Sequence, residues 1–335
     1  MYIDYNENLT EVIKDYRKAV DKCLDQLLPP ENTMPNKLHE AMRYSVFAGG
    51  KRIRPVSVLL ACEMFNGDIE KAINPAIAIE IFHNFTLLHD DIMDNAPIRR
   101  GKETVFKKWN ANIAILSGDT MFALAYKYLI KTDSQILQNI LDIFTTAAIE
   151  VCEGQQYDMN FENLENVCLD DYMEMIRLKT AVLIAASMKT GAVIGKANQQ
   201  DAHNVYKFGE CIGLAFQLQD DLLDVYADTN KFGKETGGDI ATNKKTFLYI
   251  QSLQEAKGEQ AKMLRHYFSS TNFNREEKIN AVKSIYDELG VKKATEKRIN
   301  DYYIKAFEYF SLIKVADDKK IKMKNFADQM MHRDF

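Results

Sequence analysis

Two short segments of the chain concentrate carboxylates in the same pattern, Asp-Asp-x-x-Asp, at residues 90–94 and 220–224. Each segment follows a long apolar run. If each is helical, its three carboxylates lie at about 0°, 100° and 40° around the helix axis and share one face. Like charges on one face repel each other and cannot be buried without compensation. The pattern therefore predicts two acidic clusters with cations between them.

The six carboxylates offer hard oxygen ligands, and no Cys-x-x-Cys spacing or His-Glu-x-x-His pair accompanies them. Such donors select Mg²⁺, or alternatively Mn²⁺, over zinc. Mg²⁺ usually takes few carboxylates and completes its shell with water and phosphate oxygens, so a phosphorylated substrate is expected. The predicted metal ligands are Asp90, Asp91, Asp94, Asp220, Asp221 and Asp224.

Positive side chains lie near both clusters and could hold the remaining phosphate oxygens. Residues 49–55 read Gly-Gly-Lys-Arg-Ile-Arg-Pro, which suits a phosphate but also a helix–helix turn with solvated charges. An Arg-Arg pair follows Pro97 and could instead form a surface salt bridge to the aspartates. The candidate cations are Lys51, Arg54, Arg99, Arg100, Lys179, Lys234 and Lys244.

Polar residues beside these cations complete the candidate set. His83 lies seven residues before Asp90, at nearly the same angular position, where it is either a structural residue or part of the site. Lys179, followed by Thr180, lies among apolar residues and either needs a partner or an anion, or extends to the surface. Gln217 precedes the second cluster. The glycine-rich, cationic loop at 231–239 suggests a lid over a metal–anion site.

The elements that must carry these residues are helices. All six prolines lie at or before Pro97, so no linker is evident beyond that point. Apolar periodicity predicts an all-α fold in a single domain over residues 1–335. The expected helices cover about 4–28, 36–47, 68–95, 104–130, 132–153, 170–196 and 200–227, with three or four more after 247, and the stretch 56–66 is apolar and ends at a turn.

Composition excludes several function classes. The formal net charge of −5 gives no reason to expect nucleic-acid binding. No apolar run approaches the length needed to span a membrane. Five scattered cysteines and a start without a basic segment lead us to expect a reduced, cytoplasmic protein. No Gly-x-x-x-x-Gly-Lys-Ser/Thr motif is present, which excludes a P-loop nucleotide site.

Apolar side chains precede both clusters, including Phe82 and Phe85 before the first and Leu214 and Phe216 before the second. A charged rim above an apolar helical shaft suits an amphiphile with a diphosphate head and a hydrocarbon tail. The sequence therefore predicts a diphosphate ester of an apolar chain as the substrate.

Six motifs in this order and spacing resemble the trans-isoprenyl diphosphate synthases. They are GGKRIRP, HNFTLLHDDIMD, RRG, the Lys179-Thr180 pair, FQLQDDLLD and FGKETGGDI, and the match is close over residues 40–250. The resemblance implies an all-α bundle around a deep central cavity, usually a homodimer. It also implies isopentenyl diphosphate and an allylic diphosphate as substrates, with Mg²⁺, three ions per site, bridging the aspartates to the allylic diphosphate.

The same resemblance assigns roles to matching positions. It places Arg99, Lys179, Thr180, Gln217, Lys234 and Lys244 at the allylic diphosphate, and Lys51, Arg54, His83 and Arg100 at the isopentenyl diphosphate. Catalysis would depend most on Asp90, Asp91, Asp94, Lys179, Gln217, Asp220 and Lys234. The family reaction begins with loss of diphosphate to give an allylic carbocation, which the alkene of isopentenyl diphosphate attacks before a proton is removed.

Product length in this family depends on bulky residues before the first cluster. Phe85 lies five positions and Thr86 four positions before Asp90, and no insertion separates Asp91 from Asp94. Five residues of helix span about 7.5 Å, which is room for one or two isoprene units. A single aromatic floor without an insertion resembles the short-chain members of the family that make a C20 product, with C15 as the alternative. Ala114, Ser117 and Met121 of the neighbouring helix could tip this balance. Rival interpretations are a class I terpene cyclase, a non-catalytic subunit of a heteromeric synthase, and a structural helical protein.

Overall fold

The computed structural model describes residues 6–227, 236–269 and 273–331, and the chain divides into two compact units. The first unit comprises Met1–Thr146, Ala186–Tyr206 and Ile313–Phe326. The second comprises Ala147–Ala185, Lys207–Leu312 and Ala327–Phe335. The first aspartate cluster belongs to the first unit and the second cluster to the second. A single domain over residues 1–335 stays a prediction.

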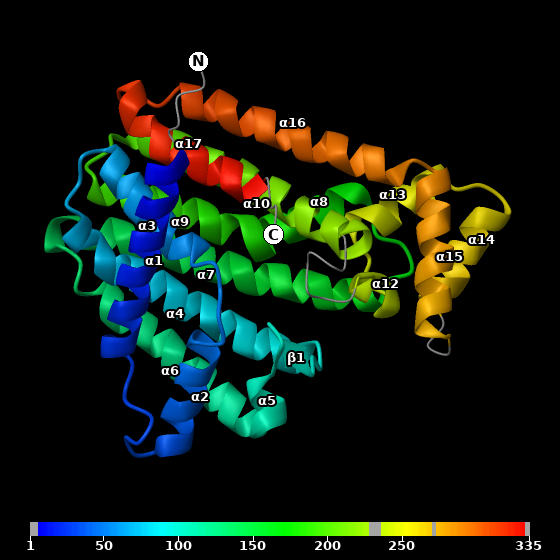
Figure 1. Cartoon of the computed structure of the whole chain (residues 1–335), viewed down its shortest axis with the longest axis horizontal. Helices are drawn as coiled ribbons and strands as arrows, with labels where there is room; N and C mark the ends of the chain where they lie inside the picture. The colour runs from blue at the N-terminus through cyan, green and yellow to red at the C-terminus, as the bar shows by residue number, and fades with distance from the viewer. Residues whose placement is uncertain (1–5, 228–235, 270–272, 332–335) are drawn as a thin grey trace. The chain divides into compact units, whose positions relative to one another are not determined.

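The first unit is built from helices and one short hairpin (Figure 1). Its helices are α1 (Asn6–Leu27), α2 (Asn36–Val46), α3 (Ile53–Met64), α4 (Ile69–Met93), α5 (Val105–Lys108) and α6 (Ala111–Leu129). It also contains parts of α7 (Ser134–Asn163), α9 (Val182–Ile194), α10 (Gln199–Tyr226) and α17 (Asp317–Met331). Within the described residues the only strands are β1 (Ile98–Arg99) and β2 (Lys102–Glu103), paired antiparallel.

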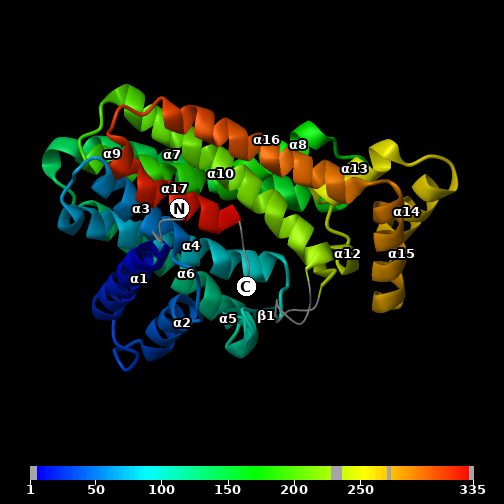
Figure 2. The ribbon, with the colours of Figure 1, turned by 45° about the horizontal axis from the view of Figure 1, so that its top comes forward.

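Helix α4 forms the centre of the first unit and carries the first cluster at its end. Its side chains are apolar and buried around most of its circumference, including Ala76, Ile77 and Phe82, so helices must cover it on several sides. Helices α3 and α6 pack along it, as both views show (Figures 1 and 2). Asp68 begins the helix by accepting a hydrogen bond from the Glu70 amide at 3.1 Å.

The second unit holds the remaining helices. They are α8 (Leu169–Ile176), the π-helical turn η1 (Arg177–Ala181), α12 (Gly238–Ala241), α13 (Phe247–Glu255), α14 (Glu259–Ser269), α15 (Arg275–Glu288) and α16 (Val291–Ser311). Most of α7 and α10 and the ends of α9 and α17 also belong to this unit. Helices α14 and α15 lie side by side, and α15 also packs on α12 (Figures 1 and 2).

The structure confirms the all-α prediction and corrects several boundaries. The helix expected over 104–130 is broken at Trp109, because Asn110 begins α6 as its N-cap and accepts a hydrogen bond from the Ile113 amide. The helix expected over 170–196 is interrupted by η1, and α7 runs ten residues beyond its expected end. Five helices follow residue 247 in the described part of the chain, rather than three or four. No helix among the described residues is long and apolar enough to cross a membrane.

Candidate active site

The first aspartate cluster lies at the C-terminal end of α4, where Asp94 is the cap residue. This position is electrostatically unfavourable, because a helix C-terminus carries partial negative charge. Arg99 offsets that charge by donating from Nε to Asp91 Oδ1 at 2.6 Å and from Nη2 to Asp90 Oδ2 at 2.9 Å. Burial raises the pKa of Asp91, while the guanidinium of Arg99 lowers it. The salt bridge between this arginine and the aspartates is therefore real in this structure.

The two adjacent arginines are directed to different partners by a tight hairpin. Arg100 and Gly101 form its two-residue turn, both with positive φ (53° and 75°), as a type I′ turn requires. Arg99 pairs with the aspartates, whereas Arg100 donates to the carbonyl oxygen of Gly49. The hairpin thus connects the first cluster to the glycine-rich turn before α3.

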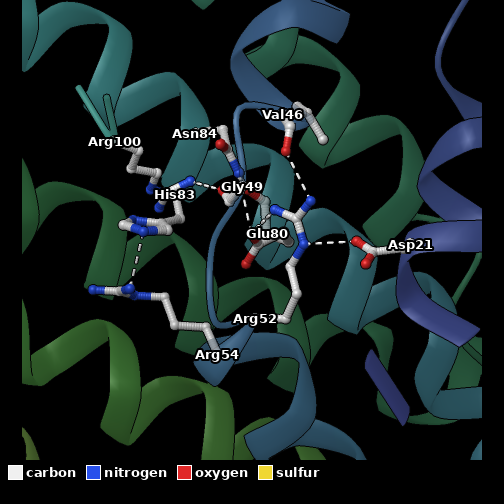
Figure 3. A network of polar contacts seen from close by, with 9 residues as sticks. All are labelled: Asp21, Val46, Gly49, Arg52, Arg54, Glu80, His83, Asn84 and Arg100. Carbon is white, nitrogen blue, oxygen red and sulfur yellow. Dashed lines mark hydrogen bonds and ion pairs between the residues drawn. The ribbon is translucent and has the colours of Figure 1, made fainter. Parts of the chain in front are cut away.

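That turn is organised by an arginine to which the sequence assigned no role. Arg52 has positive φ (51°) and is 5% exposed. It donates to Glu80 Oε1 at 2.7 Å, to Asp21 Oδ1 at 2.8 Å and to the Val46 carbonyl at 2.7 Å (Figure 3). Glu80, itself 2% exposed, also accepts from Asn84 Nδ2 at 3.2 Å. Because a buried ion pair needs such full satisfaction, this network fixes the turn rather than binding a ligand.

The other two cations of residues 49–55 have different surroundings. Arg54 Nη1 lies 3.0 Å from His83 Nε2, and Figure 3 shows their side chains meeting apart from the Arg52–Glu80 pair. Lys51 is exposed. Burial and the positive charges of Arg54, Arg100 and Arg99 hold the pKa of His83 well below its usual range. His83 is therefore neutral at pH 7, and Nε2 accepts from Arg54.

The predicted cavity floor is an aromatic cluster rather than one ring. Phe85 contacts Phe82 at a centroid distance of 5.5 Å and Phe122 at 5.3 Å. Tyr126 and Phe144 extend the cluster. On its other side Phe85 meets the ring of His89 edge to face at 4.8 Å. Thr86 donates its hydroxyl to the His83 carbonyl at 2.8 Å.

On helix α6, Gly118 and Phe122 lie next to Phe85. A Cβ at Gly118 would lie 2.4 Å from His89 Nε2 and 3.2 Å from the Phe85 ring. The three α6 residues expected to tip product length, at positions 114, 117 and 121, are fully buried, and their effect on product length stays a prediction.

The second cluster lies on α10 and is held by neutral hydrogen bonds. Asp221 is 4% exposed and accepts from the Tyr172 hydroxyl and from Gln217 Nε2 at 3.0 Å. Gln217 lies one turn before Asp221, and its Oε1 accepts from the Thr180 hydroxyl at 2.9 Å. Burial, together with the charge of Asp239, raises the pKa of Asp221 to about 8.

Lys179 and Thr180 lie in the π-helical turn η1, between two close helix contacts. A Cβ at Gly154 of α7 would come within 2.3 Å of the Lys179 amide nitrogen. A Cβ at Gly213 of α10 would come within 2.6 Å of Ala181 Cα. Lys179 finds the partner that its apolar neighbours required, because Nζ lies 2.5 Å from Asp158 Oδ2. Such turns are frequent at functional sites, and here it places Lys179 and Thr180 beside α7 and α10.

The segment that follows the second cluster folds back onto Asp224. The Gly237 amide donates to the Asp224 carbonyl at 2.6 Å, and the Asp239 amide to Asp224 Oδ2 at 3.0 Å. Burial and the charge of Asp224 raise the pKa of Asp239, whereas Lys244 lowers the pKa of both carboxyls. Lys244 therefore lies where it balances these carboxylates. Lys234 and residues 231–235 of the expected lid lie outside the described residues.

Sequence reasoning missed several residues that contact the candidate site. Asp239 lies inside the FGKETGGDI motif, so its carboxylate could have been assigned to the second aspartate cluster. Tyr172, Asp158 and Glu80 have no sequence signal, because each reaches its partner from a distant helix. Lys245 serves as a structural cap, donating to the Phe161 carbonyl at 2.6 Å near the end of α7.

The residues of the two clusters fit a hard divalent cation. All six predicted ligands offer carboxylate oxygens, and the buried Asp221 accepts from two neutral donors, Tyr172 and Gln217, so a cation would compensate its charge. Across the described ranges, no group of three or more His, Cys, Asp or Glu side chains could hold a metal ion by itself. Mg²⁺ accepts such a site, because it can bind one or two carboxylates and take its other ligands from phosphate and water.

Comparison with known proteins gives consistent matches. The family model "Polyprenyl synthetase" matches residues 35–289. The chain is 40% identical over 249 residues to a geranylgeranyl diphosphate synthase of Methanosarcina mazei, covering 74% of this chain and 76% of that protein. It is 36% identical over 329 residues to a geranylgeranyl pyrophosphate synthase of Geoglobus acetivorans, covering 97% and 99%. A crystal structure of geranylgeranyl pyrophosphate synthetase from Pyrococcus horikoshii superposes with a TM-score of 0.91 at 34% identity, covering 98% and 99%.

Proposed function

From the premise that this chain belongs to the polyprenyl synthetase family and is a prenyltransferase, we propose that it makes the C20 all-trans prenyl diphosphate. The family joins isopentenyl diphosphate to an allylic diphosphate and depends on a divalent metal. The observation that carries the assignment as a prenyltransferase is that both aspartate clusters are complete, with Arg99 bonded to the first and Lys244 acting on Asp224 of the second. A non-catalytic subunit would not need this full set.

The residues that would hold Mg²⁺ are the three aspartates of residues 90–94 and the three of residues 220–224, with three ions proposed per active site and Mn²⁺ as a substitute. When bound, the metal neutralises charge that develops on the departing diphosphate. Arg99 already donates hydrogen bonds to both Asp90 and Asp91. In the proposed complex part of its guanidinium would donate to the allylic diphosphate instead. Lys179, Thr180, Gln217, Lys234 and Lys244 are the other proposed contacts of that diphosphate.

Isopentenyl diphosphate would bind at Lys51, Arg54, His83 and Arg100. A neutral His83 supports this assignment, because it keeps Arg54 oriented without adding charge to the arginines. With Nε2 accepting from Arg54, Nδ1–H is the donor to a phosphate oxygen. The second diphosphate would therefore meet a set of fixed guanidinium and imidazole donors.

The reaction needs no side-chain nucleophile. The C1–O bond of the allylic substrate breaks and its electron pair leaves with the diphosphate. The C4 alkene carbon of isopentenyl diphosphate then bonds to C1, and a proton lost from C2 passes to the departing diphosphate. The chain's cations stabilise the leaving group, and its apolar walls keep water from the allylic cation.

The aromatic cluster around Phe85 supports the C20 product. A growing tail that descends along α4 would meet Phe85, which is backed by Phe82 and Phe122 and cannot move aside easily. The M. mazei and G. acetivorans relatives named above as geranylgeranyl synthases agree with this length. Farnesyl diphosphate, C15, is the alternative product.

The test is to size the products made from radiolabelled isopentenyl diphosphate with each allylic primer. We expect C20 from the wild-type enzyme and longer products from Phe85→Ala, because the floor is removed. Phe106→Ala, outside the aromatic cluster, is the matched control and should still give C20. A C15 wild-type product would refute the C20 proposal. An unchanged product from Phe85→Ala would refute the proposal that Phe85 limits product length.

The active form is proposed to be a homodimer. Helix α6 exposes Ile115 and Leu116 on its surface, at 41% and 56%. Exposed aliphatic side chains that are neighbours on one helix favour a second copy of the chain as partner. Light scattering coupled to size-exclusion chromatography should give twice the mass of the chain. Leu116→Glu should then give a monomer.

A further inference from the structure

Helix α15 carries a buried cation outside the proposed site. The side chain of Lys278 is 3% exposed, and no acidic side chain in the described part of the chain forms an ion pair with it. Its Nζ donates to Asn243 Oδ1 and lies 5.3 Å from the centre of the Phe268 ring. A buried ammonium without a carboxylate is costly, and a methionine would fill this space more favourably. The lysine therefore serves something other than packing.

The partner of Lys278 holds a strained position in the chain. Asn243 has a φ of 62°, in the left-handed region that asparagine tolerates better than most residues. The next residue is Lys244, whose amide donates to the Asp239 carbonyl at 2.9 Å. The hydrogen bond from Lys278 thus fixes the turn from which Lys244 projects.

Ile279, the next residue on α15, contacts the start of segment 237–244, whose far end holds Asn243. Gly237, with a φ of 78°, is so close to Ile279 that a Cβ would lie 2.7 Å from its side chain. Between these two contacts the segment 237–244 binds Asp224 through the amides of Gly237 and Asp239. Two consecutive residues of α15 therefore hold both ends of the segment that braces the second aspartate cluster.

We propose that Lys278 is a positioning residue that clamps segment 237–244 onto Asp224 and so sets the affinity of the second cluster for a metal–diphosphate. This inference rests on the proposed function, because it takes residues 220–224 as metal ligands. Lys278 itself touches neither substrate nor metal. It acts through Asn243, which orients Lys244, and through the backbone that donates to Asp224.

The experiment measures binding of Mg²⁺–pyrophosphate by calorimetry, together with the melting temperature of each variant. Lys278→Met should weaken binding by about tenfold, the scale typical of lost outer-shell partners of a metal site. Its melting temperature should stay at or above that of the wild type, because an apolar side chain replaces a buried charge. Lys293→Met, an exposed lysine on α16, is the matched control and should change neither quantity.

A second variant keeps α15 intact. Asn243→Gly retains the left-handed turn and removes the acceptor, so it should weaken binding as much as Lys278→Met does. The double variant should bind no more weakly than either single variant, because both remove one interaction. Normal binding by both single variants, or additive losses in the double variant, would overturn the proposal.

A further variant separates this inference from the proposed function. Asp220→Asn should abolish most binding if the second cluster holds the metal. If it does so while Lys278→Met and Asn243→Gly bind normally, the positioning role alone is wrong. If the wild-type protein and Asp220→Asn bind Mg²⁺–pyrophosphate equally, the assignment of the second cluster is wrong and the positioning role falls with it.

Discussion

Asp91 and Asp221 occupy the same place in their two clusters, yet different chemistry holds them. Asp91 is paired with a guanidinium delivered by a hairpin, so part of its charge is already balanced. Among the described residues, Asp221 accepts hydrogen bonds from two neutral donors, Tyr172 and Gln217, and burial raises its pKa to about 8. The comparison teaches that a repeated motif can supply one carboxylate ready for a cation and another that gains its charge balance only when a cation arrives.

The largest expected effect is the loss of Asp221 itself. Asp221→Asn keeps the hydrogen-bonding shape but removes the negative charge, and kcat/KM should fall by about 1,000-fold, the scale of losing one preorganised electrostatic contact. Steady-state kinetics with saturating Mg²⁺ measures this. Asp170→Asn, an exposed residue on α8, should retain full activity. A loss below tenfold for Asp221→Asn would show that the second cluster is not part of the metal site.

The next effect is a pH dependence specific to the second cluster. Metal binding requires ionised Asp221, so affinity for Mg²⁺–pyrophosphate should fall by up to about tenfold for each pH unit below 8. Asp221→Asn should lack this component, so the difference between the two pH profiles isolates it. If the two profiles are parallel, Asp221 ionises at ordinary pH and the contrast with Asp91 disappears.

The same pKa predicts the stability of the metal-free protein. The pKa of Asp221 is raised from its ordinary 3.8 to about 8, so the folded state binds more protons than the unfolded state between these values. The contribution of Asp221 to stability should therefore be fully present below pH 4 and be lost as the pH rises toward 8. Thermal melts of wild type and Asp221→Asn across this range should diverge accordingly, and Mg²⁺–pyrophosphate should reduce the divergence.

The smallest expected effect tests the two hydrogen bonds that the Arg99 guanidinium donates to the first cluster. Arg99→Lys keeps the positive charge but loses the geometry that bridges Asp90 and Asp91, so KM for the allylic diphosphate should rise by about fivefold. Arg265→Lys, exposed on α14, provides the control. An unchanged KM would mean that Arg99 acts as a point charge and that its two-atom contact has no role in substrate binding.

The sequence predicted those parts of the site that are encoded locally. Spacing predicted that each aspartate triplet lies on a helix, and the structure confirms this for α4 and α10. That the triplets bind metal stays a prediction. Arg52 was not distinguishable from Lys51 or Arg54, because only the distant Glu80 and Asp21 show which of the three cations is buried. The same reason hides Tyr172, which meets Asp221 from 49 positions away. Helix periodicity also cannot predict the π-helical turn, which lies where α7 and α10 come close to it at Gly154 and Gly213.

The π-helical turn also has a consequence for deletions in this part of the chain. A π-helical turn accommodates one residue more than a regular α-helix does. Deleting a single residue between positions 177 and 181 would let the segment relax into one uninterrupted α-helix. Because the turn absorbs the extra residue, the helices on either side would keep their relative directions, and only the residues within the turn would change theirs. Lys179 lies inside the turn, so the direction of its side chain depends on the extra residue, whereas the directions of the apolar residues of α9 do not.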